Sequence, residues 1–256
     1  MIEDGGSARG SVTTVRRVGD TVRRPRGRWT ANVHALLRHL ADAGFLRAPR
    51  ALGVDEDGSE ILSFLDGEVA MRPWPAALRE RSGVVELAVW LREYHDVVRD
   101  FRPPCPDEWF VPGVSWRPGR LVRHGDLGPW NSVWRGSRLV GFIDWDFAEP
   151  GDPLDDLAQL AWYCVPLGGR ATGAGGEESR VRVRERLAAV CTAYGAEPVS
   201  VLDALAGLQE REARRITDLG GRGLEPWTSF LARGDATAIE EERAWLLTHR
   251  EGLLVG

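Results

Sequence analysis

The sequence contains no lysine, and all 33 of its basic residues are arginines. Schiff-base enzymes, pyridoxal enzymes and NTPases with a GxxxxGK[ST] loop all need a lysine amine for binding or catalysis. These enzyme classes are therefore excluded. A bias toward GC-rich codons is enough to explain the missing lysines, so their absence by itself indicates no particular activity.

Cysteines and long apolar segments are also scarce. The three cysteines, Cys105, Cys164 and Cys191, lie far apart and form no CxxC pair, which is typical of free thiols in a reducing cytoplasm. No apolar run approaches the roughly 18 residues that span a bilayer, and the first ten residues, MIEDGGSARG, lack the apolar stretch of a signal peptide. We therefore expect a cytoplasmic protein that does not associate with membranes.

The charge and the length narrow the possibilities further. A net charge of −5 gives no general reason to expect nucleic-acid binding. The chain has 256 residues, 43% of them hydrophobic and 28% charged, which is ordinary for a globular protein. This length suits one large domain or two small ones with a substantial core. The oligomeric state does not follow from these numbers.

The first 66 residues are rich in β-forming sequence. Two such runs flank Gly19 and Asp20 within residues 11–25, which predicts a hairpin. Apolar residues at helical spacing predict a helix over 30–45 that begins at an N-cap, Thr30. Residues 50–68 form a second strand–turn–strand unit. This order predicts a small antiparallel sheet with one helix.

The pattern becomes mainly helical after Trp74. Residues 76–99 predict one long amphipathic helix, and residues 131–144 predict a short hairpin. Asp152 and Pro153 are a typical N-cap and first-turn residue for another helix, and the glycine-rich stretch 168–178 interrupts the helical remainder. We therefore expect an α+β fold with a small antiparallel β-sheet lobe over residues 1–66 and a larger, mainly helical lobe over residues 67–256.

The segment RHGDLGPWNSVW, residues 123–134, carries the densest group of polar side chains. Asp126 and Asn131 have the D-x-x-x-x-N spacing of a kinase catalytic loop, with His124 in the position of its histidine. An apolar strand, LVGFI, then leads to Asp144. Phosphoryl transfer requires a carboxylate that takes the proton of the attacking hydroxyl and oxygen ligands for Mg²⁺, and these residues have the required side chains.

The stretch HGDLGPWNSVW…GFIDWDFAEPGDPLDDLA, residues 124–158, resembles the aminoglycoside phosphotransferase-like (phosphotransferase enzyme) family, whose members share a bilobal protein-kinase-like fold. Weaker similarity extends back through SFLDGE to VGDTVRRP, while the last hundred residues match no motif. The resemblance implies that Asp126 is the catalytic base and that Asn131 and Asp144 bind Mg²⁺. It also implies that the linker lies against the adenine of ATP, or the base of GTP. That linker is formed by Ser63, Phe64 and Leu65.

The chain departs from this fold's usual phosphate-binding pair, a strand lysine and a helix glutamate. Arg23 occupies the position that best matches the lysine, and Arg24 is the alternative on the opposite face of the strand. No acidic residue lies between Asp20 and Asp42, and the glutamate position falls at Val33 or His34. A guanidinium binds phosphate well, so we expect an unpaired arginine that contacts phosphate directly.

The N-terminal end also departs from the fold's usual pattern. The stretch GGSARGS, residues 5–11, supplies Gly5, Gly6 and Gly10 but is not GxGxxG, and only Met1–Asp4 remain for a first strand. The small lobe therefore looks shortened.

Several of these polar residues also have plain structural interpretations. Asp126 and Asn131 are residue types that often cap turns. His124 suits a bracing role better than proton transfer, because the aspartate already supplies a base. Asp156 is expected to be structural, and Asp146 is expected to be a solvated loop carboxylate. Trp130, Trp134 and Trp145 are expected to pack in a core rather than line a stacking pocket.

The leading hypothesis is an ATP- or GTP- and Mg²⁺-dependent phosphotransferase that acts on a hydroxyl of a small molecule. A cationic acceptor needs carboxylates nearby, for which Glu149, Asp152, Asp155 and Asp156 are candidates. The alternative is a catalytically impaired kinase-like protein that binds a small molecule or nucleotide. A metal-dependent phosphoesterase is remote, since two-metal hydrolases need more histidine and aspartate ligands.

Overall fold

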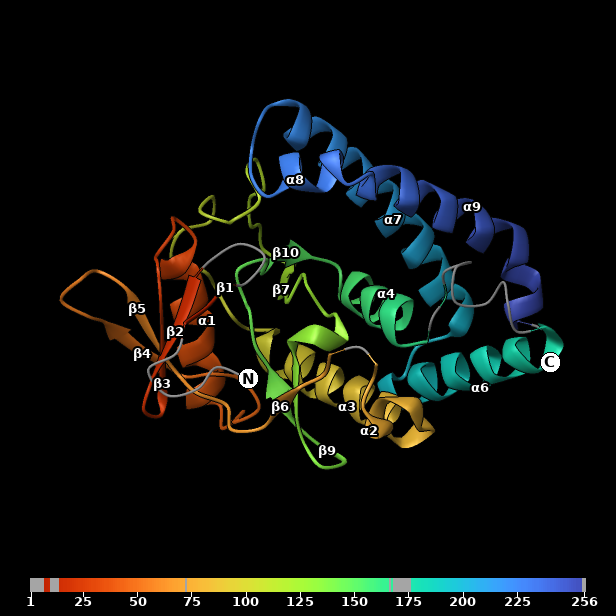
Figure 1. The fold of residues 1–256 in the computed structure, drawn as a ribbon, viewed down its shortest axis with the longest axis horizontal. Coiled ribbons are helices and arrows are strands. Elements are labelled where there is room, and N and C mark those ends of the chain that lie inside the picture. The colour runs from red at the N-terminus through yellow and green to blue at the C-terminus, as the bar shows by residue number, and fades with distance from the viewer. Residues whose placement is uncertain (1–6, 10–13, 72, 166, 168–175, 255–256) are drawn as a thin grey trace. The chain divides into compact units, whose positions relative to one another are not determined.

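The computed structural model describes residues 7–9, 14–71, 73–165, 167 and 176–254 (Figure 1). The chain divides into two compact units, Met1–Asp156 and Leu157–Gly256. The predicted lobe boundary at residue 66 lies inside the first unit and stays a prediction.

A five-stranded antiparallel sheet opens the first unit (Figure 1). Its spatial order is β1-β2-β3-β5-β4. The strands are β1 (Ser7–Arg9), β2 (Thr14–Val18), β3 (Thr21–Arg24), β4 (Ala51–Val54) and β5 (Glu60–Ser63). Both predicted hairpins are confirmed, and Gly19 adopts the positive φ of 56° that the first turn requires.

The first strand differs from the expectation. Strand β1 begins at Ser7, not within Met1–Asp4, and it pairs with β2 along its whole length. The glycines of the GGSARGS stretch, Gly5, Gly6 and Gly10, lie outside the described residues.

Helix α1 (Thr30–Asp42) follows the first hairpin. Its apolar residues at helical spacing are buried, as predicted, and so are two polar residues, Asn32 and His34. Thr30 is not the predicted N-cap but the first residue of the helix, and Trp29 takes the N-cap position. The turn before the helix is closed by hydrogen bonds between Gly27 and Thr30. The Gly27 N–H donates to Thr30 Oγ1 at 3.0 Å, and the Thr30 N–H donates to Gly27 O at 3.1 Å.

The predicted helix over 76–99 is in fact two helices, α2 (Ala76–Arg79) and α3 (Arg81–Val98). Glu80 between them has an extended backbone with ψ of 152°. The two helices approach closely at Gly83, where a Cβ would lie only 1.9 Å from Ala77 O. The break at Glu80 lets α2 pack against α3, and the missing side chain of Gly83 leaves room for this close contact.

Two small sheets complete the first unit. The first joins β6 (Glu68–Val69), β8 (Ser132–Arg135) and β9 (Arg138–Phe142), and it contains the predicted hairpin over 131–144. The second pairs β7 (Leu121–Arg123) with β10 (Glu149–Gly151). A 3₁₀ turn over Pro129–Asn131 connects β7 to β8. The catalytic-loop sequence thus lies between two short strands.

An aromatic core in the first unit packs against this loop. Trp90 of α3 is fully buried, with its ring centroid 4.4 Å from that of Phe142. Trp145 is 1% exposed, and its ring lies 4.4 Å from that of His124. Trp134 is also buried, so the expectation that Trp134 and Trp145 belong to a core is confirmed.

The second unit is helical. It contains α6 (Gly176–Tyr194), α7 (Pro198–Gly221), α8 (Trp227–Ala232) and α9 (Asp235–Leu254), and α4 (Pro153–Cys164) crosses the boundary between the units. Helices α7 and α9 lie side by side over buried leucines (Figure 1). Arg243 of α9 donates to Glu210 of α7 at 2.8 Å. Along the described part of the chain, no helix has the length and apolarity to cross a membrane.

Candidate active site

Asp126 and Asn131 meet in the loop after β7. The Asn131 side-chain amide donates to Asp126 Oδ2 at 2.7 Å and to the Asp126 carbonyl oxygen at 2.9 Å. Asn131 is 5% exposed, and its place is set by the 3₁₀ turn that ends at this residue. The predicted base and one predicted metal ligand are therefore fixed relative to each other by two hydrogen bonds.

Gly125 lets this loop lie against the segment that follows Asp144. Its φ is +79°, a conformation that favours glycine. A Cβ at this position would lie 2.1 Å from Phe147 O. The loop residue directly before Asp126 therefore has to be glycine for both conformation and space.

Asp156 holds the backbone of the same loop from within the core. Its carboxylate accepts from the His124 N–H at 2.8 Å, from the Gly125 N–H at 3.1 Å and from His95 Nε2 at 3.2 Å. Burial acts to raise the pKa of Asp156, but the hydrogen bond from His95 and the nearby positive charges outweigh it and lower the pKa. The carboxylate is thus an ionised structural anchor, as the sequence suggested.

His124 is a neutral brace in this arrangement. The ring is fully buried, and burial lowers its pKa to about 4. Nδ1 accepts the Asp126 N–H at 3.3 Å, and Nε2 lies 3.2 Å from Ile143 O. Only the tautomer with its proton on Nε2 satisfies both contacts. His124 therefore links the catalytic loop to the strand that leads to Asp144.

Asp144 sits just beyond β9 in a strained conformation. Its φ of +62° makes it the one non-glycine residue with positive φ in the part of the chain that the structure describes. Such backbone strain is found mostly at functional sites, where surrounding contacts maintain it. The side chain is 40% exposed, so its carboxylate is accessible to a ligand.

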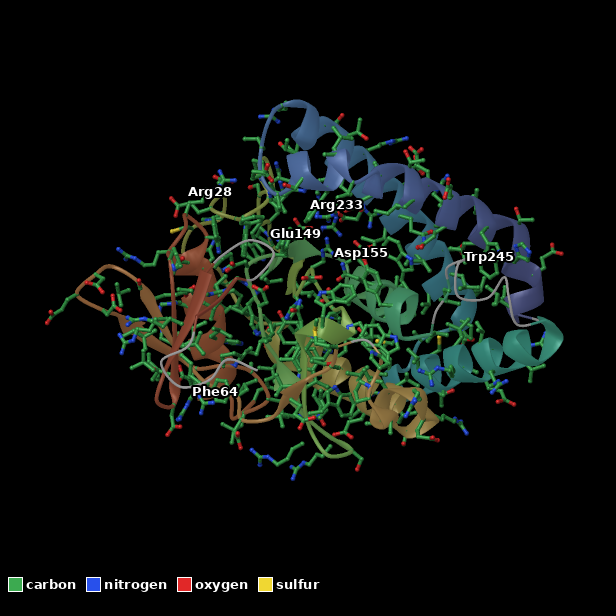
Figure 2. All side chains as sticks on the ribbon, viewed as in Figure 1. Arg28, Phe64, Glu149, Asp155, Arg233 and Trp245 are labelled. Carbon is green, nitrogen blue, oxygen red and sulfur yellow. The ribbon has the colours of Figure 1, made fainter. Side chains whose placement is uncertain are left out.

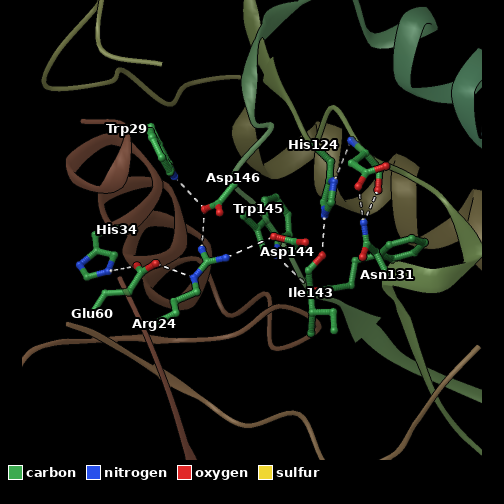
Figure 3. A network of polar contacts seen from close by, with 12 residues as sticks. Arg24, Trp29, His34, Glu60, His124, Asn131, Ile143, Asp144, Trp145 and Asp146 are labelled. Atoms are coloured by element: carbon green, nitrogen blue, oxygen red, sulfur yellow. Dashed lines mark hydrogen bonds and ion pairs between the residues drawn. The ribbon is translucent and has the colours of Figure 1, made fainter. Parts of the chain in front are cut away.

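Arg24 of β3 contacts Asp144 and two other carboxylates (Figure 3). Nη1 lies 3.2 Å from Asp144 Oδ1, Nη2 lies 2.7 Å from Asp146 Oδ1, and Nε lies 2.5 Å from Glu60 Oε1. Burial would lower the pKa of Arg24, but the three carboxylates outweigh it and raise the pKa further above its usual value.

Arg23, the better candidate from the sequence, has a different partner. Neighbouring side chains on a strand point to opposite faces. Arg23 Nη1 donates to Asp55 Oδ2 at 3.0 Å on the other face of the sheet. Arg24, the weaker candidate from the sequence, is the arginine that contacts Asp144.

The arginine is also not unpaired, contrary to expectation. Glu60 stands directly opposite Arg24 in the β3–β5 register and is 1% exposed. His34 Nε2 lies 2.7 Å from Glu60 Oε2. Helix α1 therefore contributes a histidine where the fold usually has a glutamate, and the carboxylate comes from a strand instead.

Asp146 is a further correction, because it is no solvated loop carboxylate. It is 2% exposed, and Trp29 Nε1 donates to its Oδ1 at 2.8 Å. Burial raises the pKa of Asp146 to about 6, although the charge of Arg24 acts in the opposite direction.

The predicted linker follows β5. The Ser63 N–H donates to Arg50 O at 2.9 Å, and Ser63 Oγ accepts from the Arg50 N–H. Phe64 follows directly on strand β5 and its side chain is labelled in Figure 2. Its backbone N–H donates to Asp20 O at 2.9 Å, and the Arg17 guanidinium lies 3.8 Å from the centre of its ring. Leu65 is half-buried. These contacts tie the linker to Arg50, just before β4, and to the β2–β3 hairpin.

Most of the carboxylates proposed for a cationic acceptor have structural partners. Glu149 is 3% exposed and accepts a hydrogen bond from Arg123, opposite it in the β7–β10 pair. Asp152 Oδ1 accepts the Leu154 N–H at 2.9 Å, which is the predicted N-cap. Asp156, in turn, accepts from the backbone of the loop at His124 and Gly125.

The oxygen atoms of Asn131 and Asp144 suit Mg²⁺. The side-chain nitrogen of Asn131 donates both hydrogen bonds to Asp126. The side-chain oxygen, Oδ1, is therefore the atom that could bind a metal ion. Within the described ranges, no group of three or more His, Cys, Asp or Glu residues is arranged to hold a metal ion. Mg²⁺ commonly takes one or two protein carboxylates and completes its shell with water and substrate phosphates. The donor pair fits that pattern.

Comparison with known proteins agrees with this geometry. Residues 114–190, which include the catalytic loop and Asp144, match the model of the phosphotransferase enzyme family. The trifolitoxin immunity protein of Rhizobium leguminosarum bv. trifolii is 40% identical over 165 residues, which are 62% of this chain and 60% of that protein. Viomycin phosphotransferase of Streptomyces vinaceus is 43% identical over 60 residues, which are 22% of this chain and 21% of that enzyme.

These matches cover only part of each relative: the chain spans 60% of the first curated relative and less of the second. A structural likeness extends further. The amicoumacin kinase hAmiN, solved with AMP-PNP, Ca²⁺ and Ami, aligns over 93% of this chain and 87% of that one, with a TM-score of 0.61 at 10% identity. The resemblance predicted from the sequence is therefore confirmed: residues 114–190 match the phosphotransferase enzyme family, and the chain has the protein-kinase-like fold of the solved relatives.

Proposed function

We propose that the protein transfers the γ-phosphoryl group of ATP or GTP to a hydroxyl of a small molecule. The observation that carries this proposal is the pair of hydrogen bonds between Asn131 and Asp126, on a loop that His124 links to the strand before Asp144. A base and two oxygen ligands in this order are what phosphoryl transfer requires from a protein.

In this mechanism Asp126 accepts the proton of the acceptor hydroxyl as its oxygen attacks the γ-phosphorus. The bond from that phosphorus to the β-phosphate oxygen breaks, and the nucleoside diphosphate leaves. Asn131 and Asp144 would hold Mg²⁺, which would supply neutralisation of the charge on the phosphate oxygens. His124 and Asp156 keep the loop backbone in place through their contacts with it. Neither of them has to exchange a proton.

The nucleotide base is proposed to lie against the linker of Ser63, Phe64 and Leu65. The position of these residues directly after β5, in a chain with this fold, supports the assignment. The solved amicoumacin kinase contains an ATP analogue and a divalent cation, which supports the same requirement here. Whether ATP or GTP is preferred is decided by binding measurements with both.

The acceptor is proposed to be an antibiotic or toxin with a free hydroxyl. Support comes from the relatives, one of which is named a phosphotransferase of viomycin and another an immunity protein against trifolitoxin. The buried or engaged states of Glu149, Asp152 and Asp156 remove the main sequence argument for a strongly cationic acceptor. Uncharged and peptide-like compounds therefore belong in the screen beside aminoglycosides.

The test begins with transfer of labelled γ-phosphate from ATP and GTP to a panel of hydroxylated antibiotics, with Mg²⁺. We expect a labelled product with at least one acceptor, and Asp126→Asn should lower its rate by two orders of magnitude or more, because general base catalysis contributes about 10²- to 10⁴-fold. Equal rates in the wild type and Asp126→Asn would exclude Asp126 as the base.

A catalytically impaired kinase-like binding protein is the second candidate. It is favoured by the replacement of the usual lysine–glutamate pair with Arg24 and Glu60, and by a relative that is named for immunity rather than catalysis. Such a protein would bind an acceptor or nucleotide tightly without turnover. Labelled product from any acceptor, lost in Asp126→Asn, decides against it.

A further inference from the structure

The guanidinium of Arg24 is engaged on three sides. Each of its three nitrogens lies within 3.2 Å of a different carboxylate, on Glu60, Asp144 and Asp146. The side chain is only 5% exposed. A cation that binds nucleotide phosphates needs exposed N–H groups, and Arg24 has few to offer.

The carboxylates around Arg24 are themselves held. His34 contacts Glu60 from helix α1, and Trp29 donates to Asp146 (Figure 3). Glu60 and Asp146 are 1% and 2% exposed, whereas the Asp144 side chain is 40% exposed. The network is thus buried at every charged member except Asp144, the proposed metal ligand.

Asp144 needs such a support because of its backbone. Its φ of +62° is costly for a residue other than glycine and persists only where neighbouring contacts maintain it. Arg24 Nη1 donates to the Asp144 carboxylate at 3.2 Å. The same guanidinium fixes Asp146, two residues further along the chain.

We propose that Arg24 is a positioning residue for Asp144, and not the cation that binds the nucleotide phosphates. The guanidinium, fixed by Glu60, holds Asp144 and Asp146 together and so sets the geometry of the metal-binding carboxylate. This inference rests on the proposed function, since it assigns a role within the same site.

A lysine at position 24 separates the two roles. Lysine is the residue with which this fold usually binds phosphate, and it keeps the positive charge. Its ammonium is a compact point charge and cannot reproduce the planar fork that reaches three carboxylates at once. Arg24→Lys should therefore preserve or improve binding if position 24 contacts phosphate, and should disturb the metal ligand if it positions Asp144.

The experiment measures the affinity for ATP and for GTP by calorimetry, once in EDTA and once in Mg²⁺. The ratio of the two affinities, the Mg²⁺ gain, is compared among the wild type, Arg24→Lys, Trp29→Phe and Asp55→Asn. Asp55→Asn is the matched control, because it breaks the ion pair of Arg23 on the opposite face of the same strand. Thermal melting in EDTA checks that each variant folds.

For Arg24→Lys we expect metal-free affinity within 2-fold of the wild type and a Mg²⁺ gain about 10- to 100-fold smaller, the usual effect of losing a contact that orients a metal ligand. Trp29→Phe keeps an aromatic ring but loses the donor to Asp146, and its gain should fall about 5-fold. Asp55→Asn should match the wild type in both conditions.

An unchanged Mg²⁺ gain in Arg24→Lys overturns the inference. The inference is also overturned if the nucleotide affinity of this variant falls as much in EDTA as it does in Mg²⁺. If Arg24→Lys does not fold, Trp29→Phe decides, and an unchanged gain in that variant overturns the inference. A wild type without any Mg²⁺ gain overturns the proposed function as well. If the wild type shows a Mg²⁺ gain and both Arg24→Lys and Trp29→Phe retain it, the positioning role of Arg24 is overturned and the proposed function is not.

Discussion

Asn131 donates two hydrogen bonds to one residue, Asp126, at 2.7 Å to its carboxylate and at 2.9 Å to its backbone carbonyl. The proposed base and the proposed metal ligand therefore cannot move independently. The first bond orients the Asp126 carboxylate, and the second fixes the backbone on which it sits. Both use the amide nitrogen, so the same contacts also orient the Asn131 carbonyl oxygen. One side chain thus sets the geometry of two chemical roles.

Replacing Asn131 with alanine should impair metal-dependent nucleotide binding. The substitution removes one proposed ligand and both hydrogen bonds to Asp126, so we expect the Mg²⁺ gain in nucleotide affinity to fall at least 10-fold. The free energy of unfolding should fall by about 1–3 kcal/mol, because two hydrogen bonds to the half-buried Asp126 are lost. Calorimetry and urea unfolding measure the two effects.

Asn32→Ala provides the matched control. Asn32 is also buried and makes three hydrogen bonds, two to carbonyls of Cys105 and Glu108 and one from the Cys105 N–H. Its loss should lower stability to a similar extent and leave the Mg²⁺ gain unchanged. If both variants lost the gain equally, general loosening of the fold would explain the result better than a ligand role for Asn131.

The contact between Asp126 and Asn131 could be predicted from the sequence because it depends on short-range spacing. Asp126 and Asn131 are five residues apart, and one hairpin separates them from Asp144. Spacing over such distances, with an alternation of strand and turn, determines which side chains meet. The hairpins and the burial of helix α1 were predictable for the same reason.

The network around Arg24 was not predictable in this way. Arg24 and Glu60 are cross-strand neighbours, but helix α1 and strand β4 separate β3 from β5 in the chain. Their register is set by tertiary packing, which sequence periodicity does not reveal. The burial of Asp146 depends on the same contacts. One signal was available: a strand arginine and a strand glutamate in a lobe whose helix has no acidic residue before Asp42, its last position.

Removing the carboxylate of Asp156 should destabilise the fold strongly. Asp156→Ala leaves two backbone N–H groups of the catalytic loop and His95 without their recorded acceptor in a fully buried place. We expect a loss of about 3–5 kcal/mol in the free energy of unfolding. Asp96→Ala breaks a surface pair with Arg99, both largely exposed, and should cost less than about 1 kcal/mol.

Urea unfolding of the two variants at neutral pH tests this difference. Similar losses for Asp156→Ala and Asp96→Ala would contradict the anchoring role of Asp156.

Gly125 and Gly136 allow a comparison of backbone strain with and without a steric clash. Both have positive φ, +79° and +61°. A Cβ at Gly125 meets Phe147 O at 2.1 Å, whereas nothing lies within 4 Å of a Cβ at Gly136. Gly136→Ala should therefore cost about 1–2 kcal/mol of stability from conformation alone.

Gly125→Ala adds a clash with backbone to the same strain, so its loss of stability should exceed that of Gly136→Ala by at least about 1 kcal/mol. It should also displace Asp126 and lower the rate of phosphate transfer, while Gly136→Ala leaves that rate unchanged. Chemical denaturation and the transfer assay give both numbers. Equal losses of stability would mean that the segment at Phe147 moves aside without cost.

His124 should make stability depend on pH in a way that a glutamine cannot. Burial lowers its pKa to about 4, whereas a histidine in the unfolded chain titrates near 6.5. Between these values the unfolded chain binds more protons, so the contribution to stability is fully present above about pH 6.5 and is lost as the pH falls toward 4. From pH 7 to pH 5 the loss amounts to roughly 2 kcal/mol.

Asp146 has the opposite effect on the pH dependence of stability. Burial raises the pKa of its carboxyl to about 6, so the ionised carboxylate destabilises the fold above that pH. The two effects overlap, so the pH dependence of the wild type alone does not isolate the histidine. His124→Gln retains Asp146 and a donor for Ile143 O but does not titrate. The difference in unfolding free energy between wild type and His124→Gln, measured by urea unfolding, should shrink by roughly 2 kcal/mol from pH 7 to pH 5. Parallel curves for the two proteins would show that His124 is not a buried, neutral brace.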